Sequence, residues 1–139
     1  MITDGNGIPF AVKLTGANAH DVTQLLPLVD AIPPVKGKRG RPRRRPAVLV
    51  ADRGYDSDRH REELKALGIA PLIARRYVDH GSGLGILRWM VERTIAWLHQ
   101  FRRLKIRYDR RPDIHEAFLS IACSLICWNF LNLPSSSFC

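Results

Sequence analysis

Seven cationic side chains fall within ten consecutive residues, and this run limits what the chain can fold into. They are interleaved with Gly37, Gly40 and Pro42, and prolines flank the run on both sides. Like charges at this density repel one another, and glycine and proline disfavour regular structure, so the run predicts an exposed, flexible arm. The cations are Lys36, Lys38, Arg39, Arg41, Arg43, Arg44 and Arg45. We therefore expect a basic loop at residues 36–46, with the ordered elements before and after it.

This basic arm holds most of the positive charge of the chain. The formal net charge is +9, and without these seven cations 15 basic residues stand against 13 acidic ones. Neutralising phosphates with such an arm releases counterions, which gives salt-sensitive binding without sequence preference. We therefore interpret the arm as a contact surface for a nucleic acid and not as a linker that only aids solubility. A second basic cluster at residues 102–111 is interleaved with apolar side chains, and it fits nucleic-acid contact and a half-buried segment equally well.

The overall composition is that of a globular protein. The chain has 139 residues, of which 45% are hydrophobic and 25% are charged, as in one folded domain. Three cysteines cannot form a disulfide framework, and no signal segment is readable, so we expect a cytoplasmic location. The longest apolar stretch, residues 117–131, contains three polar residues and is shorter than the roughly 20 residues of a membrane span. It predicts a buried core helix and no membrane contact.

Hydrophobic patterning and turn residues predict an α/β fold class. The expected elements in the first half are a β-hairpin over residues 1–14, a helix over 22–32 that Pro27 kinks or restarts, a strand over 47–51 and a helix that ends before Gly68. A strand over 69–74 follows, in which Pro71 indicates either an edge strand or the start of a strand. We then expect a loop over 77–85 and helices over 86–101 and 114–132. The apolar strand at 47–51 is expected to be buried on both faces. We expect one domain over residues 1–133 and a disordered tail over 134–139.

Two carboxylates are the candidates for chemistry. Asp52 directly follows the strand at 47–51, at the carboxyl end where open α/β sheets place functional groups. Glu92 lies on the helix at 86–101, with Arg88 four residues before it and His99 seven residues after it, along nearly one face. Carboxylates beside cations suit divalent-metal chemistry on phosphodiesters. From these residues alone, a turn-forming Asp52 and a solvated Glu92 are the more common arrangement.

Two sequence motifs add a family resemblance. Residues 51–56, Ala-Asp-Arg-Gly-Tyr-Asp, resemble the second-aspartate motif of bacterial insertion-sequence transposases of the DDE class. Residues 88–94, with Trp97 and residues 101–104, resemble the helix that carries the third acid of that family. The family signature on this helix is Tyr, Arg, Glu and Lys, whereas this chain has Gly85 and His99 in the Tyr and Lys positions. The resemblance extends over residues 1–131.

The resemblance implies a ribonuclease-H-like catalytic domain for DNA transposition. Such a domain cuts and joins transposon ends with two Mg²⁺ or Mn²⁺ ions, which would be held here by Asp52 and Glu92. Arg88 and His99 would contact the double-stranded DNA of the transposon ends and the target. The resemblance further implies a homo-oligomer when the protein is complete, and a bacterial cytoplasmic protein that associates with the nucleoid through DNA.

The family's first aspartate lies on a strand that precedes the hairpin. Because this chain starts inside the hairpin, we expect a ribonuclease-H-like domain that lacks its first strand and needs an upstream transposase segment, either as a fragment or as a second-frame product. Asp4 aligns with the hairpin aspartate and is a weaker candidate for a substitute ligand, since it occupies a turn position. Two alternatives stay open: a non-catalytic DNA-binding or inhibitory module, and a metal-dependent nuclease of the same fold.

Overall fold

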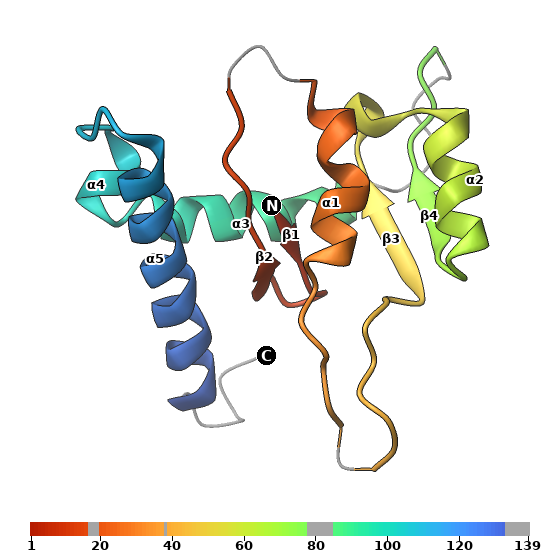
Figure 1. Cartoon of the computed structure of the whole chain (residues 1–139), viewed down its shortest axis with the longest axis horizontal. Coiled ribbons are helices and arrows are strands. Elements are labelled where there is room, and N and C mark those ends of the chain that lie inside the picture. The colour runs from red at the N-terminus through yellow and green to blue at the C-terminus, as the bar shows by residue number, and fades with distance from the viewer. Residues whose placement is uncertain (17–19, 38, 78–84, 133–139) are drawn as a thin grey trace. The chain divides into compact units, whose positions relative to one another are not determined.

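The computed structural model describes residues 1–16, 20–37, 39–77 and 85–132, with the backbone alone at Asp21 and at residues 85–88. It combines helices with two small sheets, as expected for the α/β class (Figure 1). Two compact units can be distinguished, one formed by Met1–Leu14 and Met90–Cys139 and the other by Thr15–Trp89. The tail expected at 134–139 lies outside the described residues.

The unit Thr15–Trp89 is built on a two-stranded parallel sheet. Strand β3 (Val48–Ala51) pairs with β4 (Ala70–Ile73) along its full length. Parallel strands need a crossover connection, and helix α2 (Asp58–Ala66) lies within it. Gly68 has a φ of +77° just after this helix, a left-handed conformation that glycine adopts without strain and that turns the chain toward β4. The predicted strand, helix, glycine and second strand are therefore confirmed.

Helical residues before the basic arm complete this unit. A 3₁₀ turn, η1 (Asp21–Gln24), leads into helix α1 (Leu25–Asp30). The helix restarts two residues before Pro27, which lies in the first turn of α1, where its missing N–H leaves no helical hydrogen bond unmade. The buried hydrophobic side chains of the unit are Leu25, Leu28, Val29, Ile32, Leu49, Leu64, Ile69 and Ile73.

The expectation that the strand at 47–51 is buried on both faces is wrong. Leu49 is 5% exposed, whereas Val48 and Val50 are 46% and 40% exposed. Among the described residues, β3 pairs on one edge only, with β4, and its side chains alternate between the core and the solvent. An apolar strand sequence alone does not reveal that one face is left uncovered.

The second unit is formed by two segments that are far apart in the sequence, one before Thr15 and one after Trp89. Strands β1 (Ile2–Thr3) and β2 (Pro9–Ala11) form the expected antiparallel hairpin, shorter than predicted. Its three helices are α3 (Gly85–Leu98), of which the part from Met90 belongs to this unit, α4 (Arg102–Lys105) and α5 (Pro112–Asn132). The short α4 was not among the expected elements. Leu98, Ala122 and Ile126 form the buried core of the unit, beside an edge-to-face pair of Trp97 and Phe130 with ring centroids 5.4 Å apart.

Helix α5 differs from the expected buried core helix. Its described buried residues are Ala122 and Ile126, whereas Ile121 and Trp128 are 56% and 62% exposed. In length and hydropathy the helix meets the minimum for crossing a membrane, a test that core helices of globular proteins also pass. The apolar composition predicted the helix but not which of its faces would be covered, because several of its faces are apolar.

Candidate active site

Asp52 lies at the end of β3, where the expected site begins. The strand ends at Ala51, and Asp52 is the N-cap of a short 3₁₀ turn, η2 (Arg53–Tyr55). Its Oδ1 accepts a hydrogen bond of 2.9 Å from the backbone N–H of Gly54. The side chain is exposed, and Oδ2 makes no hydrogen bond with any described residue. The turn thus fixes one carboxylate oxygen and leaves the other open to a ligand.

Gly54 allows this close contact. A Cβ atom at position 54 would come within 3.0 Å of Asp52 Oδ1, closer than ordinary van der Waals distance. The glycine in the Asp-Arg-Gly-Tyr motif therefore has a steric role, since the backbone approaches the carboxylate directly. The structure gives this part of the motif a physical explanation that is independent of any resemblance.

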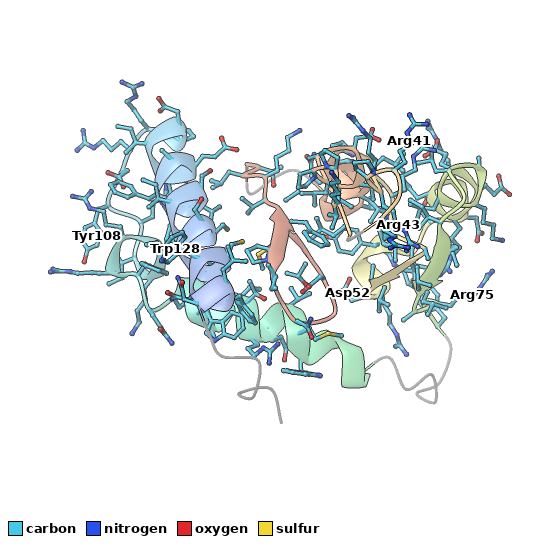
Figure 2. All side chains as sticks on the ribbon, turned by 90° about the horizontal axis from the view of Figure 1, so that it is seen from below. Arg41, Arg43, Asp52, Arg75, Tyr108 and Trp128 are labelled. Carbon is cyan, nitrogen blue, oxygen red and sulfur yellow. The ribbon has the colours of Figure 1, made fainter. Side chains whose placement is uncertain are left out.

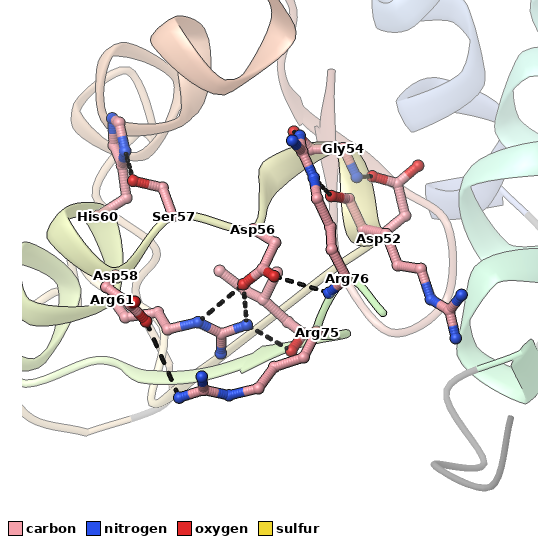
Figure 3. A network of polar contacts seen from close by, with 11 residues as sticks. Asp52, Gly54, Asp56, Ser57, Asp58, His60, Arg61, Arg75 and Arg76 are labelled. Carbon is pink, nitrogen blue, oxygen red and sulfur yellow. Dashed lines mark hydrogen bonds and ion pairs between the residues drawn. The ribbon is translucent and has the colours of Figure 1, made fainter. Parts of the chain in front are cut away.

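A network centred on Asp56 holds the Asp52 turn against the segment after β4 (Figure 3). Asp56 Oδ1 accepts from Arg61 Nη2 at 2.6 Å and Nε at 3.2 Å, and its Oδ2 accepts from the backbone N–H of Arg76 at 2.7 Å. The Arg76 guanidinium donates to the carbonyl oxygens of Arg53, at 3.0 Å, and Gly54, at 3.2 Å. Asp56, Arg61 and Arg76 are therefore positioning residues for Asp52. Sequence reasoning missed Arg76 because its contacts span 20 to 23 residues. It missed the Asp56–Arg61 pair, five residues apart, because the motif does not indicate which side chain Asp56 contacts.

These contacts also set the ionisation of Asp56. The backbone N–H of Arg76 and the guanidinium of Arg61 lower the pKa of this carboxyl below its usual value. A carboxyl whose pKa is lower in the folded state stabilises the fold above its unfolded pKa of about 3.9, and this contribution is lost as the pH falls through the folded value.

We expect Asp56→Asn to lower the free energy of unfolding at pH 7 by about 1 to 3 kcal/mol, because the variant lacks the charge-assisted hydrogen bonds of a carboxylate that is 16% exposed. The difference from the wild type should shrink in acid, below about pH 4. Denaturant unfolding at pH 7 and pH 3 measures both effects. Asp58→Asn is the matched control, because Asp58 is 80% exposed and 3.8 Å from Arg75, and an equal loss of stability in both variants would contradict the prediction.

Glu92 and His99 lie on or beside α3. Glu92 is exposed within the helix, and His99 follows its last residue, exposed, with its backbone N–H donating to Ile95 O at 2.9 Å. The backbone of Arg88 is part of α3, and its side chain lies outside the described residues. Asp52 belongs to the unit Thr15–Trp89, and Glu92 belongs to the other unit.

The hairpin turn packs against α3 within one helical turn of Glu92. Thr94 is fully buried, and its hydroxyl donates to Gly7 O at 2.6 Å, while the Arg93 guanidinium donates to Asn6 O. Asp4 Oδ1 accepts from the backbone N–H groups of Asn6 at 2.9 Å and Ile8 at 2.7 Å. Asp4 therefore forms the turn, as its position suggested, and one of its oxygens is already engaged.

The basic arm is a closed loop. Val35 and Arg43 exchange two backbone hydrogen bonds of 2.8 Å, and Gly40 turns the chain with a φ of +99°. Arg41 and Arg43 can be followed in Figure 2. Lys38 lies outside the described residues, and every other cation of the arm is exposed: Lys36, Arg39, Arg41, Arg43, Arg44 and Arg45. The predicted exposure of the arm is confirmed for these six residues.

The site provides the kind of ligand that a hard divalent cation binds, but not a full set of such ligands. Asp52 offers a carboxylate oxygen of the kind that Mg²⁺ and Mn²⁺ bind, on a turn fixed by its own backbone. Within the described ranges, no group of three or more His, Cys, Asp or Glu side chains comes together that would hold a metal ion. The described residues thus provide separate candidate ligands and not a complete coordination sphere.

Comparison with known proteins connects these residues to a family. The family described as "Transposase DDE domain" matches residues 1–127. The chain is 63% identical over 137 residues to a Burkholderia cepacia protein named as a putative transposase for insertion sequence element IS402, covering 99% of this chain and 65% of the relative. It is 30% identical over 118 residues to the Neisseria meningitidis serogroup B transposase for insertion sequence element IS1106, covering 78% of this chain and 36% of that protein. No solved structure matches.

Proposed function

This chain belongs to the transposase DDE domain family, and we propose that it takes part in DNA transposition by cutting and joining the ends of a bacterial insertion sequence. One observation carries the proposal beyond the family: Asp52 is presented at the end of β3, with one oxygen fixed by the Gly54 N–H and the other open. This is the position expected of a functional group at the carboxyl end of a strand.

In the proposed mechanism, Asp52 and Glu92 are the metal ligands. Mg²⁺ or Mn²⁺, two ions in the complete site, would activate water or a 3′-hydroxyl and stabilise the departing oxygen. Asp52 is held for this role by the η2 turn and by Arg76, which bonds the carbonyl oxygens of Arg53 and Gly54. Glu92 projects from a helix that is anchored by the buried Thr94. Bringing both carboxylates to the same metal ions would require a ribonuclease-H-like arrangement of the two units.

The proposed partner is double-stranded DNA at the element ends and the target. Arg88 and His99 would contact it near Glu92, and the basic arm would neutralise backbone phosphates without reading sequence. The exposure of six arm cations supports this role for the arm. Action on chromosomal DNA also implies a cytoplasmic, nucleoid-associated location, and joining two ends implies a homo-oligomer.

An additional transposase segment completes the site in this proposal. The chain spans 65% and 36% of the lengths of the two relatives described above. We propose that a segment outside this chain supplies the first strand and the first aspartate. Support comes from β3, which pairs on only one edge within the described residues and so has backbone groups available to a further strand.

The deciding experiment is a strand-transfer assay with pre-cleaved element ends, Mg²⁺, and a version of the protein extended upstream. Joined products support transposition. Cleavage without joining would instead indicate a metal-dependent nuclease. DNA binding with neither reaction would indicate a non-catalytic or inhibitory module, and both outcomes would contradict the proposal.

We expect neutralisation of the arm to flatten the salt dependence of DNA binding. Replacing Arg39, Arg41 and Arg44 with Gln should reduce the slope of log affinity against log salt by about 0.9 for each phosphate that is no longer neutralised. Fluorescence anisotropy with two duplexes of unrelated sequence measures the slope, and both should change alike. Replacing the same residues with Lys keeps the charge and should keep the slope. An unchanged slope in the Gln variant would rule out the arm as a DNA-binding surface.

A further inference from the structure

A second basic cluster lies on the other unit, in and after α4. Residues 102–111 contain six cationic side chains and one acidic side chain, Asp109. All six cations are exposed, and they are Arg102, Arg103, Lys105, Arg107, Arg110 and Arg111. We call this set the α4 cluster. A surface segment that serves only solubility tends to mix charges of both signs, so this excess of one sign favours an anionic partner.

Part of the cluster holds the loop in place. The Arg103 guanidinium pairs with Asp109 at 3.2 Å and lies 4.8 Å from the ring centroid of Phe118 on α5. Arg107 Nε donates to the carbonyl oxygen of Asp109 at 3.1 Å. The Asp109 side chain is 14% exposed, so the loop between α4 and α5 is fixed at its centre. The remaining cations are therefore presented from an ordered backbone.

The outward part of the cluster combines charge with apolar surface. Lys105 and Arg110 form no ion pair with any described residue, and Arg102 lies 5.8 Å from the ring centroid of Tyr108. Ile106 and Tyr108 are 54% and 51% exposed. In Figure 2, Tyr108 lies in a region where several nitrogen-tipped side chains project. Cations interleaved with exposed apolar side chains are suited to the phosphates and sugars of a nucleic-acid backbone.

We propose that the α4 cluster is a second contact surface for the phosphate backbone of duplex DNA, separate from the basic arm. The inference rests on the proposed function, because it takes DNA as the partner. The arm belongs to the unit Thr15–Trp89 and the α4 cluster to the other, so each unit binds DNA by its own surface. Once the first surface is bound, the effective concentration of DNA at the second surface rises, and the two affinities reinforce each other.

The test removes the three outward cations from the full chain. In the variant Arg102→Gln, Lys105→Gln, Arg110→Gln, the slope of log affinity against log salt should fall by about 0.9 for each phosphate released, or up to about three in all. The effect should be equal on two duplexes of unrelated sequence. Arg102→Lys with Arg110→Lys keeps the charge and should keep the slope. Thermal unfolding of each variant verifies that the fold is intact. If the triple variant is destabilised, the single variants Lys105→Gln and Arg110→Gln keep the test decisive, because neither residue forms an ion pair with a described residue and each should still lower the slope by about 0.9.

A matched control separates local DNA binding from a change in net charge. Lys13→Gln, Arg59→Gln, Lys65→Gln removes the same charge from exposed positions outside both basic segments, and its slope should stay at the wild-type value. Equal slopes in the cluster variant and this control would overturn the inference. If the arm variant lowers the slope and the cluster variant does not, the proposed function survives and this inference fails. Loss of binding to anionic lipid vesicles, with DNA binding unchanged, would overturn it in favour of a membrane surface.

Discussion

Replacing either proposed metal ligand by its amide, Asp52→Asn or Glu92→Gln, is expected to reduce cleavage and strand transfer by the upstream-extended protein on the order of 1,000-fold, or about 4 kcal/mol in the activation barrier. An amide has no negative charge with which to hold a divalent cation. The amide oxygen in Asp52→Asn can still accept from the Gly54 N–H, so the η2 turn should persist. Joined product from pre-cleaved ends measures the loss of activity, and DNA affinity should change by no more than a few-fold.

The matched controls are Asp58→Asn and Glu62→Gln, which remove exposed carboxylates from α2 at no proposed ligand position. Their activity should remain near the wild-type value. A second readout is the Mn²⁺-dependent change in thermal unfolding, which the ligand variants should diminish and the controls should not. Activity of Asp52→Asn within about ten-fold of the wild type would contradict the assignment of this carboxylate.

The second large effect concerns the chain by itself. We expect the 139-residue chain to bind DNA but not to cleave or join it, whereas a version extended upstream is active. Asp52 and Glu92 would hold a divalent cation loosely, and the aspartate that we propose lies on the upstream segment would complete the set of carboxylates that holds the two ions. A displacement of about 1 Å in a catalytic group can cost roughly 100-fold in rate, so we expect a chain without the proposed first strand and its aspartate to be inactive. The same end-joining assay, run on both versions, measures the difference.

The variant Asp4→Asn of the short chain tests whether Asp4 replaces the missing ligand. The amide oxygen that replaces Oδ1 can still accept from the N–H groups of Asn6 and Ile8, so the hairpin turn should remain while the negative charge is removed. Strong joining by the short chain that disappears in Asp4→Asn would show that Asp4 is the third ligand. It would also show that no upstream segment is needed.

Local signals were sufficient to predict most helices and strands. The glycine after α2 and the apolar strand before Asp52 each act within a few residues, so the sequence alone reveals them. Whether a side chain is covered by another helix or strand depends on residues far away in the sequence. The sequence therefore did not predict that Val50 and Trp128 are exposed. The motif around Asp52 was visible in the sequence. The Arg76 side chain that holds the turn was not, because Arg76 lies 23 residues after Arg53 and 22 residues after Gly54, whose carbonyl oxygens it contacts.

The bond between Thr94 and Gly7 has a consequence for how the chain is made. These residues are 87 positions apart, so the hairpin can pack against α3 only after the intervening residues and α3 itself have left the ribosome. The unit Thr15–Trp89 is contiguous and can fold during that interval. The unit that contains Glu92 therefore cannot form until the residues from Met90 onward have been synthesised.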